Sequence, residues 1–203
     1  MKDIVVETLN ALKKNGFQVS YFDDRYECIE SLVEGINENV AIGIGGSTTI
    51  KELGIVDELE KKGNIVHWHW LEEDILNNNV FSSARRATIY ISSTNGISQD
   101  GKIINIDGMG NRISSLCFGH EKVYIIVGKN KISKDVDSAI ERIKKEVCPK
   151  NAERLNLNVP CRYTGKCSDC SSMDRMCSIT CIIEKQPMKG NIHVCIIDEV
   201  LGF

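Results

Sequence analysis

The sequence predicts an α/β fold in which a mostly parallel sheet lies between two layers of helices. Apolar runs that close on glycines alternate with amphipathic segments at helical spacing, and this alternation is typical of parallel sheets. The clearest buried strand is predicted at 121–128 and the clearest late helix at 135–147. With 203 residues and three prolines, the chain is expected to form a single domain over 1–203 with a core of its own.

The other elements follow from the same periodicities. An opening helix is expected to end at Asn15-Gly16. Asp23 or Asp24 is expected to cap a helix that ends near residue 36, and the hydroxyls of Ser47 to Thr49 to cap the helix 50–61. The remaining segments are, in chain order, strand 17–22, strand 39–46, strand 64–68, helix 71–76, strand 87–92, turn 98–101, strand 102–106 and a closing strand 192–197.

The first candidate site is the glycine-rich turn that joins strand 39–46 to the next helix. It contains Gly45, Gly46, Ser47 and Thr48. Free backbone N–H groups and the helix dipole at such a turn suit a phosphate, carboxylate or enediolate oxygen. The turn matches neither the dinucleotide fingerprint nor the P-loop, because it lacks the third glycine of the one and the lysine of the other. A tight turn with a serine cap is the structural alternative.

A second polar cluster extends from residue 92 to residue 112, beside short apolar strands. Its candidate ligand-binding side chains are Thr94, Asn95, Asn105, Asp107, Asn111 and Arg112. Loops that follow parallel strands are where α/β proteins bind ligands, and buried polar groups cost free energy unless they are paired. A series of Asn-Gly and Asp-Gly turns explains the glycines of this cluster, but it explains the polar side chains less well.

Two further segments contain side chains that can do chemistry. On a strand, His67 and His69 would share one face and Trp68 and Trp70 the other, so that the histidines could bind metal or act as bases. Packing of the indoles at a strand end is the alternative. Lys131 follows the clearest strand and points either into a ligand crevice or into solvent.

Five of the nine cysteines lie close together, within the segment 149–190. They are Cys161, Cys167, Cys170, Cys177 and Cys181. Because disulfides do not persist in a reducing cytosol, such clustered thiols indicate metal ligands or redox centres. The segment is polar and shows little periodicity, which suggests an insertion ordered by a metal or by a partner. Small buried hydrophobes, or a redox pair of Cys167 and Cys170, are the alternatives.

Several motifs in one order make the sequence similar to the LUD domain, the lactate-utilization family, over nearly its full length. The motifs are Gly45-Gly46-Ser47-Thr48 followed by Glu52-Leu53-Gly54, Ser93-Thr94-Asn95-Gly96-Ile97, Asp100 to Gly108, Gly110-Asn111-Arg112, Gly128 to Lys131, and Pro149, Asn151, Arg154, Pro160 and Cys161. The resemblance implies the fold of ribose-5-phosphate isomerase, glucosamine-6-phosphate deaminase and the CoA transferases, whose phosphate turn resembles Gly45 to Thr48.

The cysteines also look like a pattern of small stand-alone LUD proteins. This resemblance implies that Cys161, Cys167, Cys170 and Cys177 are the metal ligands and that Cys181 is a spare or an alternative. Four thiolates accept either a 4Fe–4S cluster or a zinc ion, and cysteine spacing does not choose between them. The association of the family with iron–sulfur partners in lactate oxidation favours the iron–sulfur cluster.

Charge and composition argue against two classes of function. A formal net charge of −3 gives no basic surface for non-specific nucleic-acid binding. The chain has neither the apolar core of a signal peptide nor the run of about 18 apolar residues that a membrane helix needs. We therefore expect a cytoplasmic protein that binds neither nucleic acid nor membrane.

Three functions stay open. In the first, the chain is an enzyme of lactate, small-acid or sugar-phosphate metabolism that acts on a small anion held by the Gly45–Thr48 turn. Asn95, Asn111 and Arg112 would orient the substrate, Asp107 would be the base, and Lys131 or Arg112 would stabilise charge. In the second, the chain is an electron-transfer or accessory subunit of a lactate-oxidising complex and needs a separate redox partner protein. In the third, zinc stabilises an isomerase-like or transferase-like fold. A homodimer stays open in all three.

Overall fold

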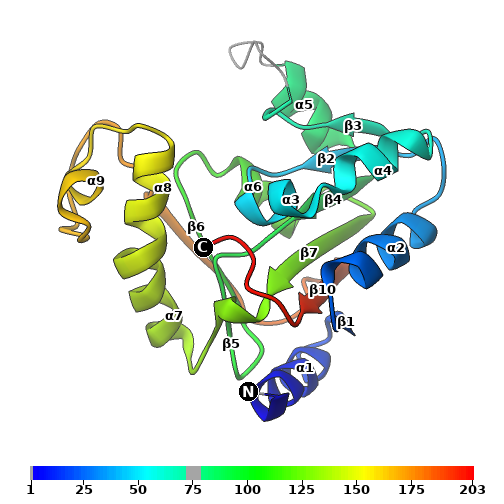
Figure 1. Cartoon of the computed structure of the whole chain (residues 1–203), viewed down its shortest axis with the longest axis horizontal. Helices are drawn as coiled ribbons and strands as arrows, with labels where there is room; N and C mark the ends of the chain where they lie inside the picture. The colour runs from blue at the N-terminus through cyan, green and yellow to red at the C-terminus, as the bar shows by residue number, and fades with distance from the viewer. Residues whose placement is uncertain (1, 72–78) are drawn as a thin grey trace.

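The computed structural model describes residues 2–71 and 79–203 (Figure 1). Its centre is a six-stranded sheet in the order β1-β10-β7-β4-β2-β3, and every pairing in it is parallel. The strands are β1 (Gln18–Phe22), β2 (Ala41–Ile44), β3 (Ile65–His67), β4 (Ile89–Ser92), β7 (Lys122–Gly128) and β10 (Ile192–Ile197). The α/β class with a parallel sheet, predicted from the sequence, is confirmed.

The closing strand β10 lies inside the sheet, between β1 and β7. Val194 pairs in register with Val19 on one side and with Ile125 on the other. Val194, Ile196 and Ile197 are fully buried, as expected for a strand with neighbours on both sides. The sheet is therefore completed by the last strand of the described chain, and its central pairings join residues far apart in the sequence.

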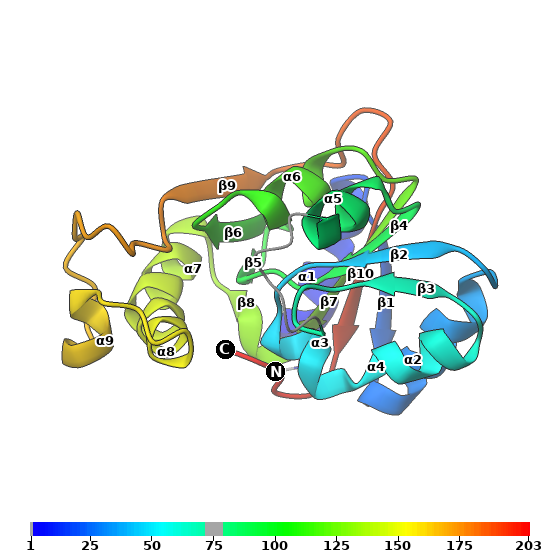
Figure 2. The same ribbon diagram turned by 90° about the horizontal axis from the view of Figure 1, so that it is seen from above.

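Helices cover both faces of this sheet (Figure 2). One face carries α2 (Arg25–Gly35), α3 (Thr48–Leu53) and α4 (Ile55–Lys61), and the opposite face carries α1 (Lys2–Lys14), α5 (Asn79–Arg86) and α6 (Asn111–Cys117). The predicted caps are present at Asp24 and Ser47, whose side chains accept hydrogen bonds from backbone N–H groups. The single helix predicted over 50–61 is wrong, because Gly54 takes a left-handed φ of 67° and divides it into α3 and α4.

A second, mixed sheet lies beside the parallel one, in the order β8-β5-β6-β9 (Figure 2). Its strands are β5 (Gly96–Ser98), β6 (Ile103–Asp107), β8 (Ile132–Ser133) and β9 (Ile179–Ile183). The sequence predicts β6, but β5 and β8 have two or three residues, too few to show the alternation of a strand. This small sheet packs against α1 and α6 on one face, through Ile103 and Ile183, and against α7 on the other.

The late helix continues past its predicted end. From α7 (Val136–Arg142) the chain passes through a π-helical turn, η2 (Ile143–Val147), into α8 (Cys148–Arg154). The π-helical turn ends two residues before Pro149, which has no N–H to donate to a regular helical ladder. The segment 149–190, in which the sequence shows little periodicity, contains most of α8, the short α9 (Pro160–Thr164) and β9.

Two other predictions concern the region after β3. The helix predicted at 71–76 lies almost entirely outside the described residues, and α5, which begins at Asn79, is not predicted from the sequence. In the described part of the chain, no helix is both long enough and apolar enough to cross a membrane.

Candidate functional site

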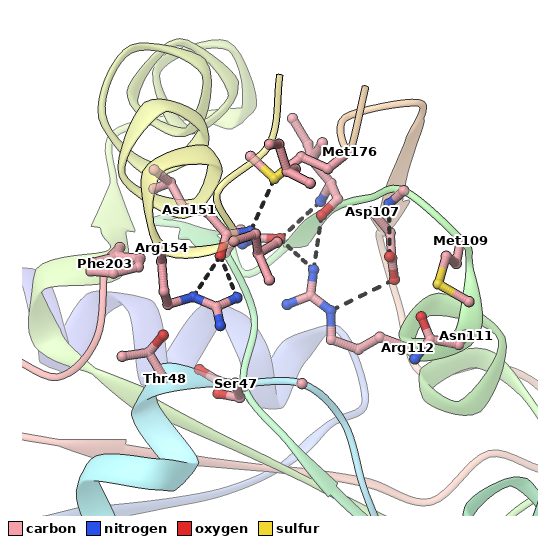
Figure 3. A pocket seen from close by; sticks show the side chains of 18 of the residues that line it. Ser47, Thr48, Asp107, Met109, Asn111, Arg112, Asn151, Arg154, Met176 and Phe203 are labelled. Carbon is pink, nitrogen blue, oxygen red and sulfur yellow. Dashed lines mark hydrogen bonds and ion pairs between the residues drawn. The ribbon is translucent and has the colours of Figure 1, made fainter. Parts of the chain in front are cut away.

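The carboxyl ends of the parallel strands open into a cavity of about 530 Å³ (Figure 3). The segments after β2, β3, β4 and β7 form one part of its wall, and α5, the end of β6, α6, α8, the loop before β9 and Phe203 contribute to the rest. Of the site residues predicted from the sequence, those that line it are Gly46, Ser47, Thr48, Thr94, Asn95, Asp107, Asn111, Arg112 and Lys131. Two separate polar clusters of the sequence thus meet in one cavity.

The glycine-rich turn after β2 packs tightly against the neighbouring strand. A β-carbon on Gly45 would lie 2.6 Å from the Tyr90 hydroxyl and 2.7 Å from Ser92 Oγ, so that only glycine fits there. Ser47 Oγ accepts a hydrogen bond from the Ile50 N–H at 3.3 Å and begins α3. The serine cap of the structural alternative is therefore present, and the turn that contains it also forms part of the cavity wall.

A buried lysine lies in the wall between the two sheets. Only 5% of Lys131 is exposed, and its Nζ donates to Thr49 Oγ1 at 2.8 Å and to Ser93 Oγ at 3.0 Å. Burial, and after it the positive charges of Arg112 and Arg142, lower the pKa of this amine to about 7. Near neutral pH the amine can therefore both accept and donate a proton.

Arg112 is fixed by contacts to three neighbours (Figure 3). Its Nη2 donates to Asn95 Oδ1 at 2.9 Å and to the Ile106 carbonyl at 2.8 Å. Its Nε lies 3.7 Å from Asp107 Oδ2. The other oxygen of Asp107 accepts from the Gly108 N–H at 2.8 Å, so both carboxylate oxygens have partners. In this arrangement Asp107 orients Arg112, and its predicted role as the base stays a prediction.

Thr94 and Asn105 are almost completely buried. Thr94 Oγ1 donates to the Ile104 carbonyl at 2.7 Å and so joins the segment after β4 to β6. Asn105 is 0% exposed, and neither its amide nitrogen nor its amide oxygen has a hydrogen-bond partner among the described residues. Asn105 does not belong to the described lining of the cavity, and its predicted binding role stays a prediction.

α8 and the turn after β3 add residues to the wall. Arg154 donates from Nε and Nη2 to Asn151 Oδ1 at 3.0 and 2.6 Å, and its guanidinium lies 4.7 Å from the centre of the Trp70 ring. His69 also lines the cavity, and burial together with the charge of Arg154 lowers its pKa and favours the neutral imidazole. Because β3 ends at His67, the two histidines do not share one strand face as predicted.

Five thiols lie near one another beside this cavity, and one of them is outside the predicted set. The predicted members are Cys161, Cys167, Cys170 and Cys177, and the fifth is Cys148 at the start of α8. Burial, and after it the charges of three neighbouring thiolates, raise the pKa of Cys148 to about 12. Negative charges on neighbouring sulfurs repel one another, so a bound cation would stabilise the deprotonated form of these thiols.

The thiols fit a metal centre by donor chemistry, since four soft thiolates accept zinc or an iron–sulfur cluster. Within residues 2–71 and 79–203, however, no group of three or more His, Cys, Asp or Glu side chains is arranged to hold a single metal ion. Cys181, the predicted spare, lies elsewhere: its sulfur is 3.9 Å from that of Cys117.

Comparison with known proteins agrees with the resemblance seen in the sequence. The profile of the LUD domain matches residues 5–197, nearly the whole chain. The chain belongs to the LUD domain family. The fold of this LUD domain is similar to that in the crystal structure of a DUF162 family protein from Deinococcus radiodurans, with a TM-score of 0.54, 12% sequence identity and 97% of each chain covered. A search of curated proteins gives no match.

Two positions of this LUD domain are not among the site residues predicted from the sequence. Arg154 is predicted only as part of a motif, and Cys148 lies one residue before the predicted cysteine-rich segment 149–190. The continuous helix from α7 to α8 places both beside the cavity. The spacing of Asn151 and Arg154 could have indicated that they act together, because residues three apart lie on the same face of a helix.

Proposed function

We propose that this LUD domain binds a small organic anion in the cavity, of the hydroxy-acid or oxo-acid class to which lactate belongs. The charge of the wall supports this: Arg112, Lys131, Arg154 and Arg175 contribute cationic groups, against two carboxylates in the described lining. Among the described residues, neither Lys131 nor Arg154 takes part in an ion pair. Lys131 is buried, and a buried charge without a partner is costly, so an anionic ligand would offset that cost; Arg154 is exposed and carries no such penalty.

Each group then has a role that its chemistry permits. Arg154 and Arg112 bind the carboxylate of the ligand, because planar guanidinium groups pair well with carboxylates. Lys131 transfers a proton to or from a carbon or oxygen next to the carbonyl, since its pKa of about 7 suits both directions. The backbone N–H groups of the turn after β2 stabilise charge that develops on the ligand oxygen. Asp107 keeps Arg112 in place.

The binding test uses lactate and pyruvate as probes in isothermal titration calorimetry, with ribose 5-phosphate as a comparison anion outside the proposed class. We expect at least one probe to bind the wild-type chain, and Arg154→Gln to weaken that binding about 10-fold or more, as the loss of a charge-assisted hydrogen bond does. Lys134→Met is the matched control, because Lys134 is exposed between β8 and α7. If no probe binds, or if Arg154→Gln binds as tightly as the control, the proposed ligand class is wrong.

The proton-transfer role has a separate readout. In heavy water, NMR follows the incorporation of deuterium next to the carbonyl of pyruvate. We expect the wild-type chain to accelerate this exchange, and Lys131→Met to abolish the acceleration while the calorimetric affinity falls much less. Equal exchange rates in the wild type and in Lys131→Met would remove Lys131 from this role and leave the binding proposal intact.

We also propose that four of the five clustered thiols hold a 4Fe–4S cluster, with zinc as the alternative. Around one zinc ion the sulfurs stand about 3.8 Å apart, given Zn–S bonds of about 2.3 Å. Thiolates that bind four different irons of one cluster stand farther apart than this. The thiols of this protein lie near one another, but those of the described residues are not arranged around a single metal ion, and this arrangement is compatible with a cluster. When bound, such a cluster accepts or releases one electron, and a separate redox partner would exchange it.

Anaerobic purification followed by iron, sulfide and zinc analysis tests the metal centre. We expect a brown protein with broad visible absorption and roughly four irons and four sulfides per chain. A colourless protein with one zinc per chain would contradict the iron–sulfur proposal and support the alternative, a structural zinc site. Neither metal in freshly purified protein would contradict both.

A further inference from the structure

We propose that Cys117 and Cys181 form a reversible disulfide when the protein meets a peroxide. Cys117 is the last residue of α6, Cys181 is the central residue of β9, and their sulfurs lie 3.9 Å apart. α6 and β9 lie beside each other in the molecule (Figure 2). Neither cysteine belongs to the described cavity lining or to the five-thiol cluster, so the proposal does not depend on the proposed ligand.

The two thiols differ in the way that this chemistry needs. Cys117 is exposed to solvent, whereas Cys181 is partly buried against the core beneath α1 and α6. The hydrogen bond between the two sulfurs lowers the pKa of Cys117 to about 7 and raises that of Cys181. The accessible sulfur is therefore the one that is a thiolate near neutral pH, and the partner behind it retains its proton.

A second pair of cysteines provides a comparison within the same chain. Cys28 and Cys195 also share a hydrogen bond, but they are 0% and 1% exposed in the core of the parallel sheet. The hydrogen bond with Cys195, and after it burial, raise the pKa of Cys28, and neither sulfur of this pair is accessible to an oxidant. Proximity is common to both pairs, and only the pair on α6 and β9 combines it with exposure.

The oxidation takes place in two steps. The Cys117 thiolate attacks one oxygen of hydrogen peroxide: a sulfur–oxygen bond forms, the oxygen–oxygen bond breaks and hydroxide leaves, which yields a sulfenic acid. The Cys181 thiol then loses its proton and attacks the Cys117 sulfur, so that a disulfide forms and the sulfur–oxygen bond breaks. Overall the two thiols lose two electrons and two protons, and one peroxide becomes two waters. The sulfurs approach by about 2 Å, because a disulfide bond is about 2.05 Å long.

Such a bond would fasten α6 to the small sheet at one end of the cavity wall. α6 begins with Asn111 and Arg112, both of which line the cavity. On the other side, Cys181 pairs in register with Asn105 of β6, two residues before Asp107. The disulfide therefore joins α6, which carries Arg112, to β9, the strand that pairs with β6 and with its last residue, Asp107.

Peptide mapping of the full-length chain tests the proposal. The protein is treated with a small excess of hydrogen peroxide, remaining thiols are alkylated, and the tryptic peptides are identified by mass spectrometry without reduction. Cys117 lies in the peptide 113–122, whereas Cys181 shares the peptide 176–185 with Cys177, so fragmentation at Thr180 tells these two apart. We expect a cross-link between Cys117 and Cys181 that dithiothreitol removes, while Cys28 and Cys195 stay reduced.

Two variants complete the test. Cys181→Ser is expected to abolish the cross-link and to leave Cys117 as a sulfenic acid that dimedone labels, and Cys117→Ser is expected to leave Cys181 unmodified. The proposal is overturned if Cys181 pairs with Cys177, if both thiols remain fully alkylatable, or if Cys117 is overoxidised while Cys181 stays free in the wild-type chain. Because the mapping of the wild-type protein needs no substitution, a variant that fails to fold does not remove the test.

Discussion

Lys131 Nζ lies 2.8 Å from Thr49 Oγ1, so the amine that follows β7 is joined to the first turn of α3, which follows β2. Thr49 is itself 1% exposed, and its hydroxyl lies 3.4 Å from the Leu201 carbonyl. Protein oxygens therefore replace water around the amine. Because they replace it incompletely, the charged form of Lys131 is disfavoured in the folded chain, and its protonation is coupled to folding.

The first prediction concerns the pH dependence of stability. The pKa of Lys131 falls from 10.5 to about 7 on folding, so between these values the unfolded chain binds more protons than the folded one. The free energy of unfolding should therefore rise with pH from about 7 to about 10, by up to ~1.4 kcal/mol per pH unit from this group. In Lys131→Met this contribution is absent. Urea unfolding at pH 7, 8 and 9 measures the difference.

The control for this experiment is Lys134→Met, which removes an exposed lysine three residues away. Its stability should follow that of the wild type at each pH. If the curves for Lys131→Met and for the wild type are parallel from pH 7 to pH 9, the amine is charged in the folded protein and its proposed role in proton transfer is lost.

The second prediction compares two carboxylates that pair with arginines. Asp107 and Arg112 are 11% and 13% exposed, and Asp107 accepts hydrogen bonds from backbone N–H groups as well. In Asp107→Asn, the amide NH₂ group would face either a backbone N–H donor or the Arg112 guanidinium. We therefore expect the free energy of unfolding to fall by about 1–3 kcal/mol. Asp169 is 76% exposed beside Arg175, so Asp169→Asn should cost less than about 1 kcal/mol. Equal losses in chemical denaturation would show that the Asp107 contacts do not contribute.

The third prediction concerns the turn after β2. A methyl group at Gly45 would meet the Tyr90 hydroxyl and Ser92 Oγ below 3 Å, so Gly45→Ala should destabilise the fold by about 1–3 kcal/mol. Gly35 is the matched control, because its nearest neighbour, the Tyr124 hydroxyl, would lie 4.0 Å from a new methyl group. Gly35→Ala should be neutral or slightly stabilising. Similar thermal midpoints for the two variants would contradict the close approach at Gly45.

The sequence predicts the parallel sheet well because each strand is a run of apolar residues bounded by turns. β7 and β10 are the best examples: both are long and almost fully buried. The misses arise where local signals are short or compete. β5 has only three residues, and at Gly54 one residue in the left-handed region interrupts an otherwise continuous helical pattern.

For the site, the sequence identifies the residue types but not their relations. Its choice of Asp107 as the base stays a prediction, but only the fold shows that both oxygens of Asp107 have partners and that Lys131 is buried among hydroxyls. Burial and partners from other strands decide these properties, and periodicity does not report them. In the same way, Cys148 and Cys161 are thirteen residues apart in the chain. They lie near each other because the chain turns after α8 and α9 packs against it.

The fourth prediction concerns the ligand set of the proposed metal centre. If Cys148 is one of the ligands, Cys148→Ala should lower the iron content per chain to less than half of the wild-type value and raise sensitivity to chelators. Cys28→Ala is the matched control, because Cys28 is also buried but lies in the core of the parallel sheet. The stability lost by creating a cavity should be about the same in both variants. Iron analysis and thermal melting with and without chelator measure the two effects. Full iron content in Cys148→Ala, together with its loss in Cys177→Ala, would make Cys148 a buried neighbour and restore the ligand set predicted from the sequence.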